Sequence, residues 1–172
     1  LDVPGYFEMA INQAESIVFS ASTSERKTGK LSKLFEEEVE SRAPRDNFFH
    51  CLVNAAHQFH IREKNDDRYL LAGYPWFKCR ARDTFISLPG LTLAIDEQDY
   101  FEFVMKTASK ALREFMAGKP VTGKIYEIDQ PDVPLWAIWS IQQYAKFAGR
   151  EKCSEMYGNL LEEIIHYIID GK

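Results

Sequence analysis

The stretch AGYPWFKCRARDTFISLPG, residues 72–90, is the most informative part of this chain. It places three aromatic residues, Tyr74, Trp76 and Phe77, within four positions and just ahead of Arg82 and Asp83. Aromatic rings stack on the C–H faces of a pyranose, while charged groups hydrogen-bond its hydroxyls. The stretch therefore predicts a carbohydrate site in a loop that leads into a helix.

Each of these residues also has a purely structural interpretation. Trp76 and Phe77 could be core aromatics, although Gly73 and Pro75 around them favour a fixed surface loop. Arg82 and Asp83 could form an ion pair in which the aspartate caps the following helix. The two interpretations are compatible, because a carboxylate fixed at a helix start can still accept a sugar hydroxyl.

A second candidate block, YEIDQPDVPLW, spans residues 126–136. It holds Asp132 between two prolines, after Tyr126 and Glu127 and just before Trp136. These features suit a carboxyl group held over a sugar. An aspartate ahead of an amphipathic helix is equally typical of an N-cap, so spacing alone leaves both roles open.

Composition excludes several classes of function. The 172 residues carry 21 Lys+Arg against 26 Asp+Glu, so no basic excess predicts a nucleic-acid partner. No apolar run reaches transmembrane length. Three widely spaced cysteines favour reduced, mostly buried thiols and a cytoplasmic location. The histidines, including His57 and His60, show no recognised ligand spacing, so neither a metal nor a cofactor is predicted.

Apolar periodicity predicts a single all-α domain over residues 1–172, in which 1–30 is a linker or carries an edge helix. The expected helices cover about 7–18, 31–39, 48–59, 83–94, 99–116, 133–145 and 153–168. Only 70–74 and 123–128 could form strands. Successive helical hairpins fit part of an (α/α)6 toroid, with both candidate loops at the same end. An ordinary helical bundle is the competing architecture.

Residues 72–93 resemble the signature AGYPWF…GRDTFISLPGL of the C-terminal amylo-α-1,6-glucosidase domain of glycogen debranching enzymes, and the resemblance extends over about 31–172. It implies the first half of an α/α toroid, an inverting glucosidase and Asp132 as general acid with a raised pKa. It also implies an α-glucan partner such as glycogen or limit dextrin. The implied glucose-binding residues are Tyr74, Trp76, Phe77, Arg82, Asp83, Tyr126, Glu127 and Trp136.

In that family the general base is a glutamate later in the domain. The resemblance therefore implies a fragment that is inactive alone and self-associates through the exposed face of a half-toroid. Two other readings remain. One is a different α/α-toroid glucosidase, trehalase-like or glucoamylase-like, and the other is a non-catalytic helical module that binds carbohydrate or another protein.

Overall fold

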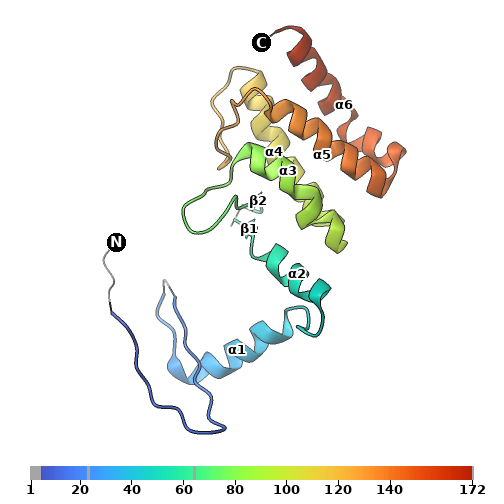
Figure 1. The fold of residues 1–172 in the computed structure, drawn as a ribbon. Coiled ribbons are helices and arrows are strands. Elements are labelled where there is room, and N and C mark those ends of the chain that lie inside the picture. Colours follow the sequence, from blue (N-terminus) through green and yellow to red (C-terminus); the bar gives the residue numbers. More distant parts are fainter. Residues whose placement is uncertain (1–4, 23, 64, 172) are drawn as a thin grey trace.

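The computed structural model describes residues 5–22, 24–63 and 65–171, and this part of the chain is mostly helical (Figure 1). The elements are α1 (Leu31–Glu40), α2 (Phe48–His57), β1 (His60–Arg62), β2 (Arg68–Leu70), α3 (Ala81–Leu91), α4 (Gln98–Met116), α5 (Val133–Ala148) and α6 (Arg150–Ile169). Two 3-10 turns, Thr28–Lys30 and Leu93–Ile95, precede α1 and α4. The predicted helical fold class is confirmed.

Helices α3 to α6 pack as two layers of successive hairpins. The most extensive helix–helix contact joins α3 to α5, and α5 also packs on α6. In an up-and-down four-helix bundle the first and third helices lie diagonally and barely touch. The observed pairing instead places α3 beside α5, with α4 behind them in Figure 1. This arrangement favours successive α/α hairpins over the ordinary bundle.

An aromatic cluster fills the space where α4, α5 and α6 meet. The ring of Phe101 lies 5.0 Å from that of Tyr144 and 6.4 Å from that of Tyr157, and the two tyrosine rings are 5.2 Å apart. Burial raises the pKa of both tyrosine hydroxyls, and the Tyr144 hydroxyl donates a hydrogen bond to Glu102. The cluster anchors three helices to one another.

The predicted helix over residues 7–18 is wrong. The described residues 5–22 form no helix, and most of their side chains are exposed, Phe7 by 79%. Among the described residues its ring contacts that of Phe19, with the ring centres 5.1 Å apart. A short amphipathic helix gains most of its stability from a surface on which to bury its apolar face. Because the apolar side chains of this segment stay largely exposed, it lacks that stabilisation.

The short extended segments were predicted only in part. β2 forms where extended chain was expected, and it pairs antiparallel with β1, which the sequence analysis missed. Residues 123–128 contribute one isolated bridge rather than a strand. Helix α3 begins two residues before the predicted start, and Pro89 lies within it, close to its end at Leu91.

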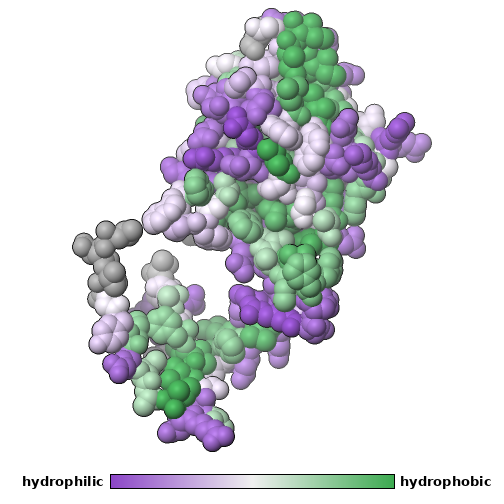
Figure 2. Space-filling view, in the orientation of Figure 1, coloured by the Kyte–Doolittle hydropathy of each residue, from purple (hydrophilic) through white to green (hydrophobic). Residues whose placement is uncertain are grey.

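Apolar side chains remain exposed at both ends of the described chain. Figure 2 shows them over α1 and the segment before it, and again along the outer end of α6, where Ile165, Ile168 and Ile169 are 43–74% exposed. None of the helices among the described residues combines the length and apolarity needed to cross a bilayer.

Candidate functional site

Main-chain hydrogen bonds join the two candidate blocks. Tyr126 N–H donates to the Cys79 carbonyl at 2.8 Å, and Ala81 N–H donates to the Tyr126 carbonyl at 2.9 Å. These two bonds form a parallel β-bridge between Arg80 and Tyr126. The start of α3 and the loop before α5 are therefore side by side, which confirms that both loops lie at the same end of the helices.

The centre of the site is the Asp132 carboxylate. Arg82 Nη2 donates to its Oδ1 at 2.7 Å, and Trp136 Nε1 donates to its Oδ2 at 3.0 Å. Asp132 occupies the N-cap position of α5, but its side chain makes no capping hydrogen bond. The interpretation of Asp132 as a side-chain helix cap is therefore wrong, because both carboxylate oxygens point to the other block and to Trp136 instead.

The charge state of Asp132 differs from the prediction. A general acid was expected to have a raised pKa, whereas the hydrogen bond from Arg82, helped by that from Trp136, lowers the pKa of this carboxyl. Asp132 is accordingly an anion at neutral pH in this conformation. The same contact raises the pKa of the Arg82 guanidinium. Burial opposes the effect on Asp132 but is the weaker influence.

A second ion pair joins the same two blocks. Arg80 Nη2 lies 3.3 Å from Glu127 Oε1, and its guanidinium carbon lies 5.1 Å from the centre of the Phe77 ring. Glu127 has a φ of 55°, in the left-handed region that non-glycine residues seldom adopt. Lys78 Nζ lies 4.4 Å from the centre of the Tyr126 ring. Sequence analysis missed Lys78 and Arg80, although both lie inside the signature stretch.

The aromatic loop is exposed, as predicted. The Tyr74 hydroxyl donates to the Gln58 carbonyl, and its ring lies 6.1 Å from that of Phe59. Trp76 is 69% exposed and Phe77 46%. The alternative that Trp76 and Phe77 are core residues is therefore wrong.

Asp83 is not hydrogen-bonded to the Asp132 centre, although its charge helps to raise the pKa of Arg82. It lies in the first turn of α3, whose N-cap is Arg80, so it is not the cap of that helix. Its carboxylate has no hydrogen-bond partner among the described residues. It lines a small pocket of about 280 Å³ together with Phe59 and Ser87. The structure thus brings Arg82, Glu127, Asp132 and Trp136 together, while the nearby Asp83 lines the pocket beside Phe59.

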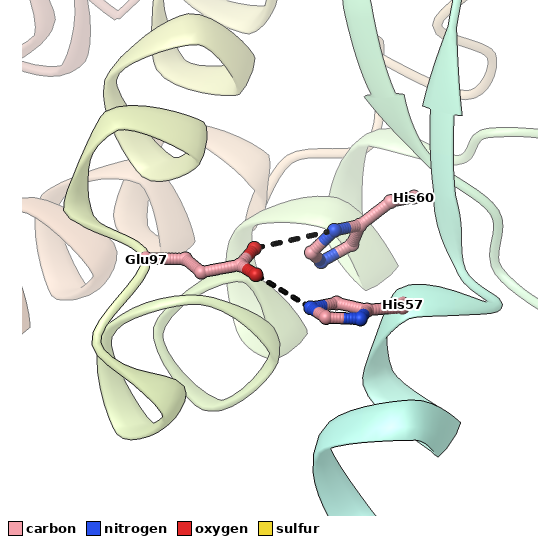
Figure 3. Close-up of side chains that lie close together, drawn as sticks. All are labelled: His57, His60 and Glu97. Atoms are coloured by element: carbon pink, nitrogen blue, oxygen red, sulfur yellow. Dashed lines mark hydrogen bonds and ion pairs between the residues drawn. The ribbon is translucent and has the colours of Figure 1, made fainter. Parts of the chain in front are cut away.

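One group of side chains among the described residues could hold a metal ion. His57, His60 and Glu97 place one ligand atom each within 4.8 Å of one another (Figure 3). The sequence analysis predicted no metal site, since Glu97 is far from the histidines along the chain. The group lies where α2, β1 and the start of α4 meet, and the two residues between its histidines, Gln58 and Phe59, contact Tyr74.

Fold and site together define a mostly helical domain in which charged residues of two loops meet beside exposed aromatic rings. The family model for amylo-alpha-1,6-glucosidase matches residues 54–172, and the chain belongs to this family. It is thus a glycosidase-type domain like that of glycogen debranching enzymes. No curated protein and no solved structure matches the chain significantly.

Proposed function

We propose that this chain supplies the glucose-binding half of an α-1,6-glucosidase site, acting on the branch points of a glycogen-like glucan. The observation that carries the proposal is the 2.7 Å contact between Arg82 and Asp132, which joins the two blocks that the family resemblance singled out. The family membership supports glucan as the substrate class. Tyr74, Trp76 and Phe77 supply the exposed rings on which a sugar can stack.

In this proposal Asp132 gives a proton to the glycosidic oxygen as the bond from that oxygen to C1 of the departing glucose breaks. A second carboxyl group takes a proton from the attacking water on the opposite face of the ring. Asp132 must hold its proton beforehand, although Arg82 favours its ionised form. A sugar hydroxyl that takes over the hydrogen bond from Arg82 would weaken the ion pair and raise the pKa of the carboxyl.

Arg82→Gln tests this coupling in the 172-residue chain. Loss of the guanidinium removes the main cause of the lowered pKa, so the Asp132 carboxyl should titrate at a higher pH than in the unmodified chain. The pH dependence of the Asp132 carboxyl carbon resonance measures this directly. The matched control is Arg80→Gln, which removes the neighbouring ion pair to Glu127 and should leave the Asp132 titration nearly unchanged.

The stability of Arg82→Gln should follow the same linkage. The folded-state pKa of Asp132 lies below its unfolded value, so the ion pair stabilises the fold above the unfolded pKa. That contribution is lost as the pH falls through the folded-state pKa. The difference in unfolding free energy between the two proteins, small because the pair is half-exposed, should therefore shrink further on acidification, and a difference that grows across that range would contradict the assigned contact.

Trp76→Ala tests the sugar platform. The indole is 69% exposed, so its removal should cost little stability, yet it should weaken binding of a branched α-glucan roughly 2- to 10-fold. Affinity electrophoresis in gels with and without limit dextrin measures the change. Phe147→Ala, which removes a half-exposed aromatic at the far end of α5, is the control and should migrate like the unmodified chain.

The remaining parts of the proposal concern the activity of the chain on its own, its self-association and its location. We propose that the chain alone binds glucan weakly and releases no glucose, because the second catalytic carboxyl group belongs to a later part of the family domain. Self-association through the exposed apolar faces and a cytoplasmic location stay predictions. Glucose release from limit dextrin by the 172-residue chain alone would contradict the division of the site.

A further inference from the structure

Three side chains from three different elements converge beside the aromatic loop. His57 ends α2, His60 begins β1, and Glu97 occupies the N-cap position of α4 without making a capping hydrogen bond. His57 Nε2 lies 2.5 Å from Glu97 Oε1, and His60 Nδ1 lies 3.6 Å from Glu97 Oε2 (Figure 3). The carboxylate thus faces one nitrogen of each ring.

The hydrogen bonding of His60 determines what its second nitrogen can do. Nε2 lies 2.9 Å from the carbonyl oxygen of Leu91, which can only accept, so Nε2 carries a hydrogen. In the neutral ring Nδ1 is then a bare lone pair that faces Glu97 Oε2. Two acceptors 3.6 Å apart repel unless a proton or a cation lies between them.

The hydrogen bond from His60 Nε2 fixes its ring in the way that is usual for metal-binding histidines. Such a ligand usually donates its other ring N–H to a carbonyl or carboxylate, which fixes the tautomer and the ring orientation. Here the Leu91 carbonyl does this, and the Tyr100 ring stacks on the imidazole at 3.9 Å with an interplanar angle of 12°. The His60 side chain is only 10% exposed, whereas those of His57 and Glu97 are 40% and 33% exposed. Water can therefore reach the open side.

We propose that His57 Nε2, His60 Nδ1 and the Glu97 carboxylate bind a divalent zinc-type cation, with water as the fourth ligand. Ligand atoms about 2.0 Å from a tetrahedral zinc lie about 3.3 Å apart. The His60–Glu97 separation of 3.6 Å is already close to this value, and the hydrogen-bonded His57–Glu97 pair would widen from 2.5 Å as the metal replaces the proton between them. Two imidazole nitrogens disfavour calcium and magnesium, which prefer oxygen ligands only.

A metal bound at this site would link α2, β1 and the start of α4 to one another. It lies next to Gln58, whose carbonyl accepts the hydrogen bond of Tyr74, and Phe59, whose ring contacts the same tyrosine. Metal binding would thus stiffen the support of the aromatic loop. The proposal rests on the geometry of the three ligands and is independent of the glucosidase assignment.

Calorimetric titration of Zn²⁺ into the chelator-treated, dialysed 172-residue chain tests the proposal. We expect one equivalent of Zn²⁺ per chain and an upward shift of Tm. His60→Gln and Glu97→Gln should each weaken zinc binding by at least the ~10- to 100-fold that loss of a supporting group causes. Glu97→Gln keeps the shape of the side chain, so it remains informative if the histidine variant folds poorly.

Two controls separate this site from other zinc-binding groups. His166→Gln removes an exposed histidine of α6 and should leave zinc affinity unchanged. His50→Gln removes the histidine that pairs with Asp46 at the start of α2, and it too should bind zinc normally. Co²⁺ in place of Zn²⁺ should give visible ligand-field bands without the thiolate charge-transfer band that coordination by Cys51 would produce.

Three results would overturn the proposal. The first is no zinc binding by the unmodified chain. The second is zinc binding that His60→Gln and Glu97→Gln leave intact. The third is a loss of affinity in His50→Gln, or a thiolate band with cobalt, either of which would place the metal elsewhere on α2.

Discussion

Asp132→Asn is expected to lower the glucosidase turnover of a protein that contains this chain and the second catalytic carboxyl group by about 10²–10⁴-fold, the contribution of a positioned acid or base. The fold should survive the change. The side chain makes no capping hydrogen bond, and its ion pair with Arg82 is half-exposed, so little stability depends on its charge. Released glucose from limit dextrin, measured beside the far-ultraviolet circular dichroism spectrum, gives both readouts.

A matched control lies in the same loop. Asp129 is exposed, three residues before Asp132, so Asp129→Asn removes the same charge at nearly the same place. It should retain most of the turnover. Equal losses in the two variants would point to the overall negative charge of the loop, and full activity in Asp132→Asn would remove this carboxyl from the reaction. A structural role for Asp132 as a helix cap is already excluded, because its side chain makes no capping hydrogen bond.

The candidate site could be predicted from the sequence as two separate blocks, and the structure supplied their connection. Both blocks carry local signals: clustered rings, charged residues and prolines just ahead of apolar helices. The bridge between Arg80 and Tyr126 joins residues far apart in the chain, and no periodic pattern encodes such a pairing. The lowered pKa of Asp132 could not be predicted for the same reason, because it depends on the contact with Arg82 from the other block.

The errors have physical causes too. Residues 7–18 have a helical period but leave their apolar side chains largely exposed, and tertiary packing rather than period decides whether such a segment becomes helical. A cap role for Asp83 was one of two interpretations left open, because aspartate is favoured there, yet the helix begins earlier, at Ala81, with Arg80 as its N-cap. The His57–His60 spacing was visible in the sequence. Glu97, the third potential ligand, is far away in the chain and is brought to the two histidines by the packing of α4.

Phe101→Ala should destabilise the fold by about 3–5 kcal/mol, a large part of the 5–15 kcal/mol that typically separates folded from unfolded domains. The ring is fully buried and contacts those of Tyr144 and Tyr157, so its removal leaves a cavity where α4, α5 and α6 meet. Urea denaturation followed by circular dichroism measures the loss as a lower midpoint.

Phe103→Ala is the matched control for this prediction, with the same residue type on the same helix two positions away. Its ring is 41% exposed and makes one contact of note, with the Arg68 guanidinium carbon 5.3 Å from its centre. Truncating it should cost about 1 kcal/mol or less. The expected difference in destabilisation follows from burial, because both substitutions remove the same atoms and change helix propensity equally. Similar losses in the two proteins would mean that the outer face of α4 is covered in solution, either by a second copy of the chain or by further parts of a longer protein.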